Sequence, residues 1–303
     1  MKVILKYGSE GLPIEFPESS GFAGILEPRE SKPLSDPRES VARSLQEPIC
    51  SPPLAELARG KKSACIVVSD ITRPVPNQLL LLPILETLVG AGIPRSKILI
   101  LIATGMHRPA TEDEIVNLVG METAQSFRIM NHFAQRRDDM FEVGKVADKI
   151  PVLVNRHYVN AELKILTGFI EPHLWAGYSG ILPGISAIET LKHMHSPEMV
   201  AHPKCKYGEL SGNPFNEAGL EVMVMAGADF IANVTLNTRK EVTGIFSGHP
   251  VKAHSQGCEF LSRHCRHELA APLDFIVTTN SGAPLDCNLY QTVKGIAGAA
   301  PVV

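Results

Sequence analysis

Two histidines occupy equivalent positions in the sequence, each in a loop that follows an apolar run typical of a buried strand. His107 follows the run at residues 97–102, and His173 follows the run at residues 163–170. An imidazole titrates near neutral pH, so it can act as a general acid or a general base. Histidines at two neighbouring strand ends could flank one substrate carbon from opposite sides, as a two-base racemase requires. A structural histidine with satisfied hydrogen bonds is the alternative for each of them.

A further pair of polar residues follows another strand-like run, at residues 63–69. Asp70 and Arg73 lie just past its end, and Pro74 comes directly after the arginine. A guanidinium fork in such a rigid loop suits a carboxylate or a phosphate. An Asp–Arg pair that only fixes the turn is the alternative interpretation.

The sequence lacks the motifs of several other activities. His193 and His195 lie two residues apart, so they do not share a helix face, and they belong to no H-E-x-x-H zinc motif. The turn at residues 177–180 lacks the spacing of a G-x-S-x-G nucleophile elbow. Neither G-x-G-x-x-G nor G-x-x-x-x-G-K-[ST] occurs, so Rossmann-type dinucleotide binding and a P-loop have no support.

These loops need a scaffold, and the order of the predicted elements indicates a parallel sheet. The buried-strand runs at 63–69 and 97–102 alternate with predicted helices, one at 77–90 with Asn77 as its N-cap and one that starts at the capping box 111–114. Strand–helix alternation implies parallel pairing with right-handed crossovers. Further strands are expected at 127–131, 142–146, 151–155 and 163–170, hairpins at 1–17 and 228–248, and helices at 54–59, 187–194, 211–226 and 251–265.

We expect an α/β protein of two domains with mainly parallel sheets and the active cleft between the domains. Residues 1–268 form the N-terminal domain with the histidine loops, and residues 269–303 begin a second domain with a strand at 274–278 and a helix from residue 288. One strand and one helix cannot bury a core by themselves. The second domain is therefore expected to be cut short, swapped or docked on the first.

The composition indicates a globular protein of the cytoplasm. The 303 residues are 44% hydrophobic and 20% charged, and the formal net charge of −3 argues against nucleic acid or an anionic membrane as a partner. No apolar run is as long as a membrane span, and residues 1–7 hold no signal-peptide core. The six cysteines include no C-x-x-C pair, so reduced thiols are expected.

Taken together, these segments resemble the nickel-dependent lactate racemase family. The resemblance runs nearly from end to end, and it is specific because several separate motifs occur in the same order. The matching motifs are SDITRPVP at 69–76, ATGMHRPATEDE at 103–114, FIEPHLWAGYSG at 169–180, ILPGISAIETLKHMHS at 181–196, GNP at 212–214 and GAPLDCNLYQTVKG at 282–295.

The resemblance implies a racemase or epimerase of a small 2-hydroxy acid such as lactate. It implies hydride transfer on a nickel-pincer nucleotide derived from nicotinic acid, and cofactor-maturation proteins as partners. Carried over position by position, it makes His107 and His173 the alternating acid–base pair, and it makes His195 the nickel ligand. The implied substrate-binding residues are Arg73, Gln291 and Lys294, and the implied cofactor-binding residues are Asp70, Tyr178, Ser179, Gly180 and Tyr290.

Two departures from the family pattern leave alternatives open. Members with a covalent cofactor carry Gly-Gly-x-Lys directly after Gly-Tyr-Ser-Gly, whereas here Gly180 is followed by Ile181, and Lys192 lies too far along to replace that lysine. The chain also ends at Val303, before the rest of a second domain. Either the cofactor is bound without the covalent anchor, or both segments are missing from this sequence; we favour the latter, since both would be mobile without cofactor. A nucleotide- or hydroxyacid-binding homologue and a metal-dependent hydrolase or lyase remain the functional alternatives.

Overall fold

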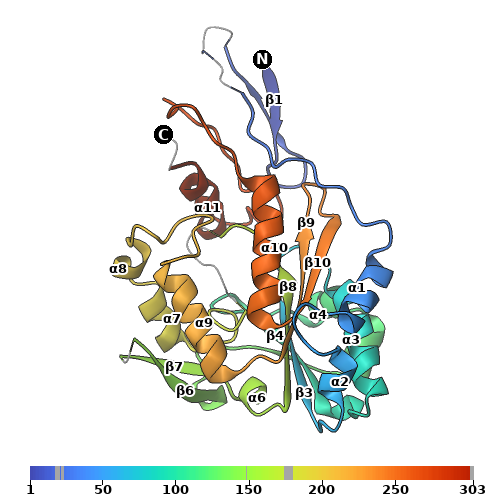
Figure 1. Cartoon of the computed structure of the whole chain (residues 1–303). Helices are drawn as coiled ribbons and strands as arrows, with labels where there is room; N and C mark the ends of the chain where they lie inside the picture. The colour runs from blue at the N-terminus through green and yellow to red at the C-terminus, as the bar shows by residue number, and fades with distance from the viewer. Residues whose placement is uncertain (18–20, 22–23, 148, 174–179, 301–303) are drawn as a thin grey trace.

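A six-stranded sheet forms the centre of the computed structural model, which describes residues 1–17, 21, 24–147, 149–173 and 180–300 (Figure 1). The strands are β3 (Ala64–Ser69), β4 (Ile98–Ala103), β5 (Arg128–Asn131), β8 (Leu163–Phe169), β9 (Phe230–Leu236) and β10 (Val242–Gly248). Their order across the sheet is β10-β9-β8-β3-β4-β5. Every neighbouring pair is parallel except β9 with β10, which form the predicted hairpin.

Side chains of the central strands alternate between two apolar cores, one on each face of the sheet. Ile66 and Val68 of β3 belong to the first core, and Cys65 and Val67 belong to the second. All four side chains are buried. A strand covered on both faces is a continuous apolar run in the sequence, which is why the strand could be predicted.

Helices cover both faces of the sheet. The first core is closed by α1 (Pro37–Gln46), α2 (Leu54–Ala58), α3 (Asn77–Gly90), α4 (Glu112–Val119) and α5 (Met121–Ser126). The second is closed by α7 (Ile188–Met194) and α9 (Pro214–Ala226), and α10 (Pro250–Cys265) packs on β9 and β10. The short helices are α6 (Arg156–Val159), α8 (Pro197–Val200) and the 3₁₀ turns Arg95–Lys97 and Arg137–Asp139. No helix within the described ranges combines the length and the apolar composition that a bilayer crossing requires.

Two helix starts differ in how well local sequence rules predicted them. The capping box at the start of α4 is present, because Thr111 and Glu114 each accept a hydrogen bond from the other's backbone amide. The bounds of α3 are as predicted, but its N-cap is Pro76 and not Asn77. The Asn77 amide instead donates to the carbonyl oxygen of Ser69 at 3.2 Å, because that oxygen at the strand end needs a donor.

Two predicted strands differ in the structure. β7 (Ile150–Asn155) does not extend the central sheet but pairs antiparallel with β6 (Met140–Val146) in a separate two-stranded sheet. Only a few residues join these strands, whereas parallel pairing needs a crossover of a dozen or more. The strand expected at 274–278 is irregular and pairs with no strand in the described part of the chain, and Phe275 is 75% exposed. Without a neighbouring strand, the backbone of this segment has no partner for the hydrogen bonds of a β-sheet.

The C-terminal segment packs against the N-terminal hairpin. That hairpin consists of β1 (Lys2–Leu5) and β2 (Leu12–Glu15), which pair antiparallel as predicted. The Gly8 carbonyl in its turn accepts a hydrogen bond from the Ala283 amide at 3.0 Å. Helix α11 (Leu289–Ala299) follows, and it appears above α7 in the view of Figure 1. The division into two domains remains a prediction.

Candidate active site

Three neighbouring strands bring predicted site residues to one edge of the sheet. β8, β3 and β4 are adjacent and parallel, so their carboxyl ends lie side by side. Asp70 and Arg73 follow β3, His107 follows β4, and His173 follows β8. Loops that are far apart in the sequence therefore become neighbours.

A buried carboxylate holds His107. The Nδ1 atom lies 2.7 Å from Asp70 Oδ2, and Asp70 is only 3% exposed. Burial acts to raise the pKa of Asp70, but hydrogen bonds from His107 and Thr72, together with nearby positive charge, lower it below its ordinary value. An ionised carboxylate can only accept, so Nδ1 of the neutral imidazole carries the hydrogen and Nε2 carries the lone pair. In this tautomer His107 can accept a proton at Nε2.

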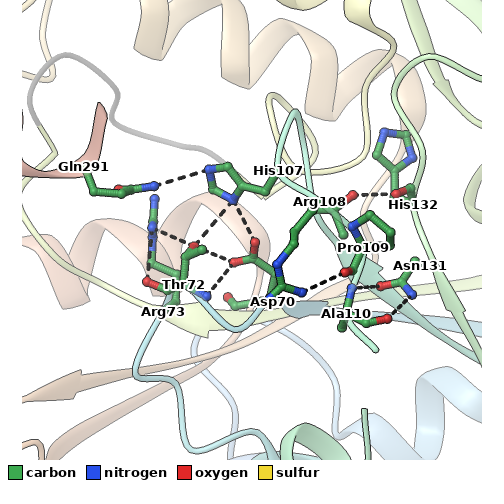
Figure 2. A network of polar contacts seen from close by, with 12 residues as sticks. Asp70, Thr72, Arg73, His107, Arg108, Pro109, Ala110, Asn131, His132 and Gln291 are labelled. Atoms are coloured by element: carbon green, nitrogen blue, oxygen red, sulfur yellow. Dashed lines mark hydrogen bonds and ion pairs between the residues drawn. The ribbon is translucent and has the colours of Figure 1, made fainter. Parts of the chain in front are cut away.

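Thr72 connects this pair to Arg73, as Figure 2 shows. The Thr72 hydroxyl donates to Asp70 Oδ1 at 2.6 Å and accepts from Nη1 of Arg73 at 3.0 Å. On another edge of the guanidinium, Nε of Arg73 lies 3.6 Å from Glu171 Oε1. The guanidinium is therefore oriented from two sides, by a hydroxyl and by a carboxylate.

Helix α11 brings two further predicted residues, Gln291 and Lys294, to the site. Asn288 caps its first turn by accepting from the Gln291 amide at 3.0 Å, and this turn points Gln291 towards His107. The Gln291 Nε2 atom lies 3.4 Å from His107 Nε2. Gln291 is only 2% exposed, yet its Oε1 has no hydrogen-bond partner among the described residues. A buried amide oxygen without a donor is unfavourable, so this position suits a ligand that donates a hydrogen bond.

The electrostatic environment keeps His173 neutral. Burial is the main cause that lowers its pKa to about 3. The positive charges of Lys294 and Arg73 act in the same direction, and so does His195, so these groups lie near the imidazole. Burial and the charge of Arg73 likewise lower the pKa of Lys294 to about 8, while nearby carboxylates oppose that shift. At neutral pH the site therefore presents a neutral His173 beside two cations.

His195 has the hydrogen-bond arrangement of a metal-binding histidine. It is the C-cap of α7, and its Nδ1 lies 2.8 Å from the carbonyl oxygen of Leu191. A carbonyl can only accept, so Nδ1 carries the hydrogen and the lone pair is on Nε2. The ring also packs edge-on against Phe215, with 5.7 Å between centroids. His193, in contrast, is exposed. A neutral imidazole fixed in this way fits a nickel ion.

The remaining predicted cofactor residues are Gly180, Tyr290, Tyr178 and Ser179. Gly180 lies against Leu166, where an added Cβ would come within 3.0 Å of the leucine Cδ1. Tyr290 lies in the first turn of α11. Tyr178 and Ser179 lie outside the described residues, so the structure does not place them.

A zinc site built from the three loop histidines is not formed. Within the described ranges, no three His, Cys, Asp or Glu side chains gather where one metal ion could bind them all. His107, His173 and His195 all belong to those ranges. Among the residues that the structure describes, these three histidines are therefore not shared ligands of one ion.

The sequence argument did not single out three residues that the structure brings to the site. Thr72 lies between Asp70 and Arg73 in the chain, and Glu171 lies two residues before a predicted catalytic histidine, so nearness in sequence was an available signal. Tyr207 donates from its hydroxyl to the Lys294 carbonyl at 2.8 Å. Nothing local in the sequence indicates that third contact.

Comparison with known proteins gives matches along most of the chain. Residues 7–208 match the family model of the lactate racemase N-terminal domain, and residues 269–303 match that of the lactate racemase C-terminal domain. A lactate racemase of Lactiplantibacillus plantarum is 38% identical over 266 residues, which cover 86% of this chain and 62% of that protein. One of Thermoanaerobacterium thermosaccharolyticum is 34% identical over 303 residues, covering 98% and 70%. The chain thus spans 62% and 70% of the lengths of these relatives.

Solved structures share the fold. The lactate racemase apoprotein from Thermoanaerobacterium thermosaccharolyticum matches with a TM-score of 0.86 and 30% identity, covering 100% of this chain and 72% of that one. A protein from Thermotoga maritima matches with a TM-score of 0.66 and 20% identity, covering 82% and 63%, and that likeness concerns the fold alone. The predicted α/β class with a mainly parallel sheet is confirmed.

Proposed function

The chain belongs to the lactate racemase family, and we propose that it interconverts the stereoisomers of a small 2-hydroxy acid such as lactate. The observation that carries this proposal is the convergence of two imidazoles and two cations at one edge of the sheet. His107 follows β4 and His173 follows β8, the strands on either side of β3, and the loop after β3 carries Arg73. Arg73 and Lys294 lie close enough to lower the pKa of His173. A site of this kind can hold an anionic acid and exchange a proton with its hydroxyl group.

Each group has a defined task in this proposal. Arg73 and Lys294 bind the substrate carboxylate, since both are positive at neutral pH. The Nε2 atom of His107 takes the hydroxyl proton of one enantiomer, and the ionised Asp70 stabilises the imidazolium that results. His173 serves the other enantiomer. Its low pKa arises partly from the two cations, so a bound carboxylate that neutralises them raises that pKa towards a useful range.

The implied cofactor is a nickel-pincer nucleotide, which when bound accepts and returns the α-hydrogen of the substrate as hydride. The Nε2 atom of His195 would hold the metal, because the Leu191 carbonyl fixes the hydrogen on Nδ1. The sequence has no lysine directly after Gly180 for a covalent bond. The intact mass of the protein, produced together with cofactor-maturation proteins, distinguishes a covalent adduct from a nucleotide held by non-covalent contacts.

The test of this function is racemisation of α-deuterated L-lactate in ordinary water. The chain is produced with cofactor-maturation proteins, and both enantiomers are measured by chiral chromatography with mass detection. We expect both enantiomers with the deuterium retained, because hydride that stays within the site does not exchange with water. No interconversion would contradict the racemase proposal, and loss of deuterium to water would contradict hydride transfer.

Variants of single histidines provide the control for that test. His107→Asn and His173→Asn should each lower the rate by about 10²–10⁴, the usual contribution of a general acid or base. His193→Asn removes an exposed imidazole and should leave the rate unchanged. Equal losses in all three variants would indicate a general effect on folding and would contradict the assigned roles.

The missing lysine favours a second candidate function, a hydroxyacid- or nucleotide-binding protein without turnover. Such a protein would bind lactate in calorimetry and yet leave its enantiomers unchanged in the test above. We also propose a cytoplasmic location for either function. The six cysteines are all free thiols in the structure, which is typical of a reducing compartment.

A further inference from the structure

Glu171 is a carboxylate in the binding region to which the proposed reaction assigns no task. Its Oε1 lies 3.6 Å from Nε of Arg73, and its side chain is 30% exposed. Its charge acts on Lys294, where it opposes the lowering of the pKa, and on Tyr207, where it adds to burial in raising the pKa to about 12. One carboxylate therefore faces three elements: the loop after β3, helix α11 and the loop before α9.

The charges around this carboxylate disfavour a second bound anion. Arg73 and Lys294 supply two positive charges, and Glu171 supplies a negative charge 3.6 Å from Arg73. The ionised Asp70 adds a second negative charge that also acts on Lys294. Burial raises the pKa of Glu171, and the two cations act in the opposite direction. One substrate carboxylate that binds both cations therefore finds no further positive charge beside them to bind a second carboxylate of the same ligand, and Glu171 would repel that second carboxylate.

We propose that Glu171 is a specificity-determining residue that restricts the Arg73–Lys294 pair to hydroxy acids with a single carboxylate. This inference rests on the proposed function, because it takes the two cations as the substrate clamp. In a four-carbon 2-hydroxy dicarboxylate only two carbons separate the carboxylates, so when one carboxylate binds Arg73 and Lys294 the other stays within a few bond lengths of the clamp that Glu171 contacts. Like charges at short range discriminate strongly against the wrong ligand.

The test is calorimetric binding of two probes, lactate and malate, to the full chain and to three variants. In Glu171→Gln the shape is kept and the charge is removed, so the affinity for malate relative to lactate should rise about tenfold or more. Glu171→Asp keeps the charge and should keep the preference for lactate. Glu142→Gln makes the same charge change on an exposed strand position of β6 and should leave the ratio unaltered. Racemisation assays of the loaded protein should give the same shift in kcat/KM.

Two failures can be told apart in this experiment. If the wild-type chain binds lactate and Glu171→Gln changes the affinities for both acids by the same factor, the specificity role is overturned and the proposed function stands. If neither acid binds to the wild-type chain or to any variant, the substrate class of the proposed function is overturned, and the inference falls with it. Thermal unfolding of each variant shows whether the fold is retained.

Discussion

At the residue scale, the chemistry of the site depends on a few side chains that set the state of their neighbours. Asp70 holds His107 by Nδ1, and Thr72 joins this pair to Arg73. Each contact fixes an orientation that a single residue could not hold by itself. The tautomer of His107 is thus a property of the buried carboxylate beside it.

The first prediction concerns Asp70→Asn. An asparagine can fill the same space, but its amide can donate to Nδ1 and so favour the other tautomer, with the hydrogen on Nε2. We expect the racemisation rate to fall by about 10²–10⁴ while the KM changes little, as for other carboxylate–histidine pairs. Steady-state kinetics in both directions measures this. A KM increase with unchanged kcat would show that Asp70 acts in substrate binding instead.

Lys294 gives the second prediction, a loss of substrate affinity in alkaline solution. Its pKa is lowered to about 8, so the ammonium is charged below that pH and becomes neutral above it. The KM for the hydroxy acid should therefore rise between about pH 8 and pH 9.5, by up to about tenfold per pH unit. Lys294→Arg stays charged over this range, so its KM should be flat. A flat profile for the wild-type protein would exclude Lys294 from carboxylate binding.

At the element scale, α11 carries substrate-binding candidates, and hydrogen bonds join it to loop residues of the described chain. Tyr207, in the loop before α9, donates to the Lys294 carbonyl at 2.8 Å. Its ring also faces Gly298, where an added Cβ would be 3.5 Å away. These contacts join the loop that follows His195 to the helix that carries Gln291, so the position of one depends on the other.

Tyr207→Phe therefore tests whether this contact positions α11. The variant keeps the ring and loses one hydrogen bond, worth about 0.5–1.5 kcal/mol. We expect a KM several-fold higher, a smaller change in kcat, and faster hydrogen exchange of the α11 amides. Tyr7→Phe removes an exposed hydroxyl from the N-terminal hairpin and serves as the matched control. Unchanged exchange in α11 would contradict the positioning role.

At the scale of the whole molecule, the buried histidine His132 connects the central sheet to the separate two-stranded sheet of β6 and β7. His132 is 1% exposed, and it follows the edge strand β5. Its Nε2 lies 3.0 Å from the Ser186 carbonyl oxygen and its Nδ1 lies 3.2 Å from Asn155 Nδ2, so the ring bridges the central sheet to β7 and to the segment before α7. Burial is the main cause that lowers the His132 pKa to about 4.

This burial predicts a loss of stability in acid. The folded-state pKa lies below the unfolded value of about 6.5, so the unfolded chain binds the proton first as the pH falls. The contribution of His132 to the free energy of unfolding is complete above about pH 6.5 and decreases towards pH 4, by about 3 kcal/mol in total. Denaturant unfolding at several pH values measures it. The His132→Gln variant should be less stable at pH 7, but its free energy of unfolding should change less between pH 6.5 and pH 4. If the free energies of the variant and of the wild-type chain fall in parallel over this range, the assignment is contradicted.

The sequence by itself determined the features that depend on neighbouring residues. Apolar runs predicted β3, β4 and β8, and the capping box predicted the start of α4, because helix caps and buried strands arise from interactions over a few residues. Placing His107 and His173 directly after such runs was sufficient to expect both at one edge of the sheet. The resemblance of the motifs added the expected chemistry.

Only the tertiary structure decided which distant groups meet. β7 joined β6 instead of the central sheet, and the segment at 274–278 formed no strand, because pairing depends on which strand lies beside it. The contact of Arg73 with Glu171 joins two loops that follow different strands, and periodicity within either loop carries no information about it. The lowered pKa of His173 is likewise set by burial and by cations from other elements. Such properties are sums over neighbours in space, and those neighbours exist only once the chain has folded.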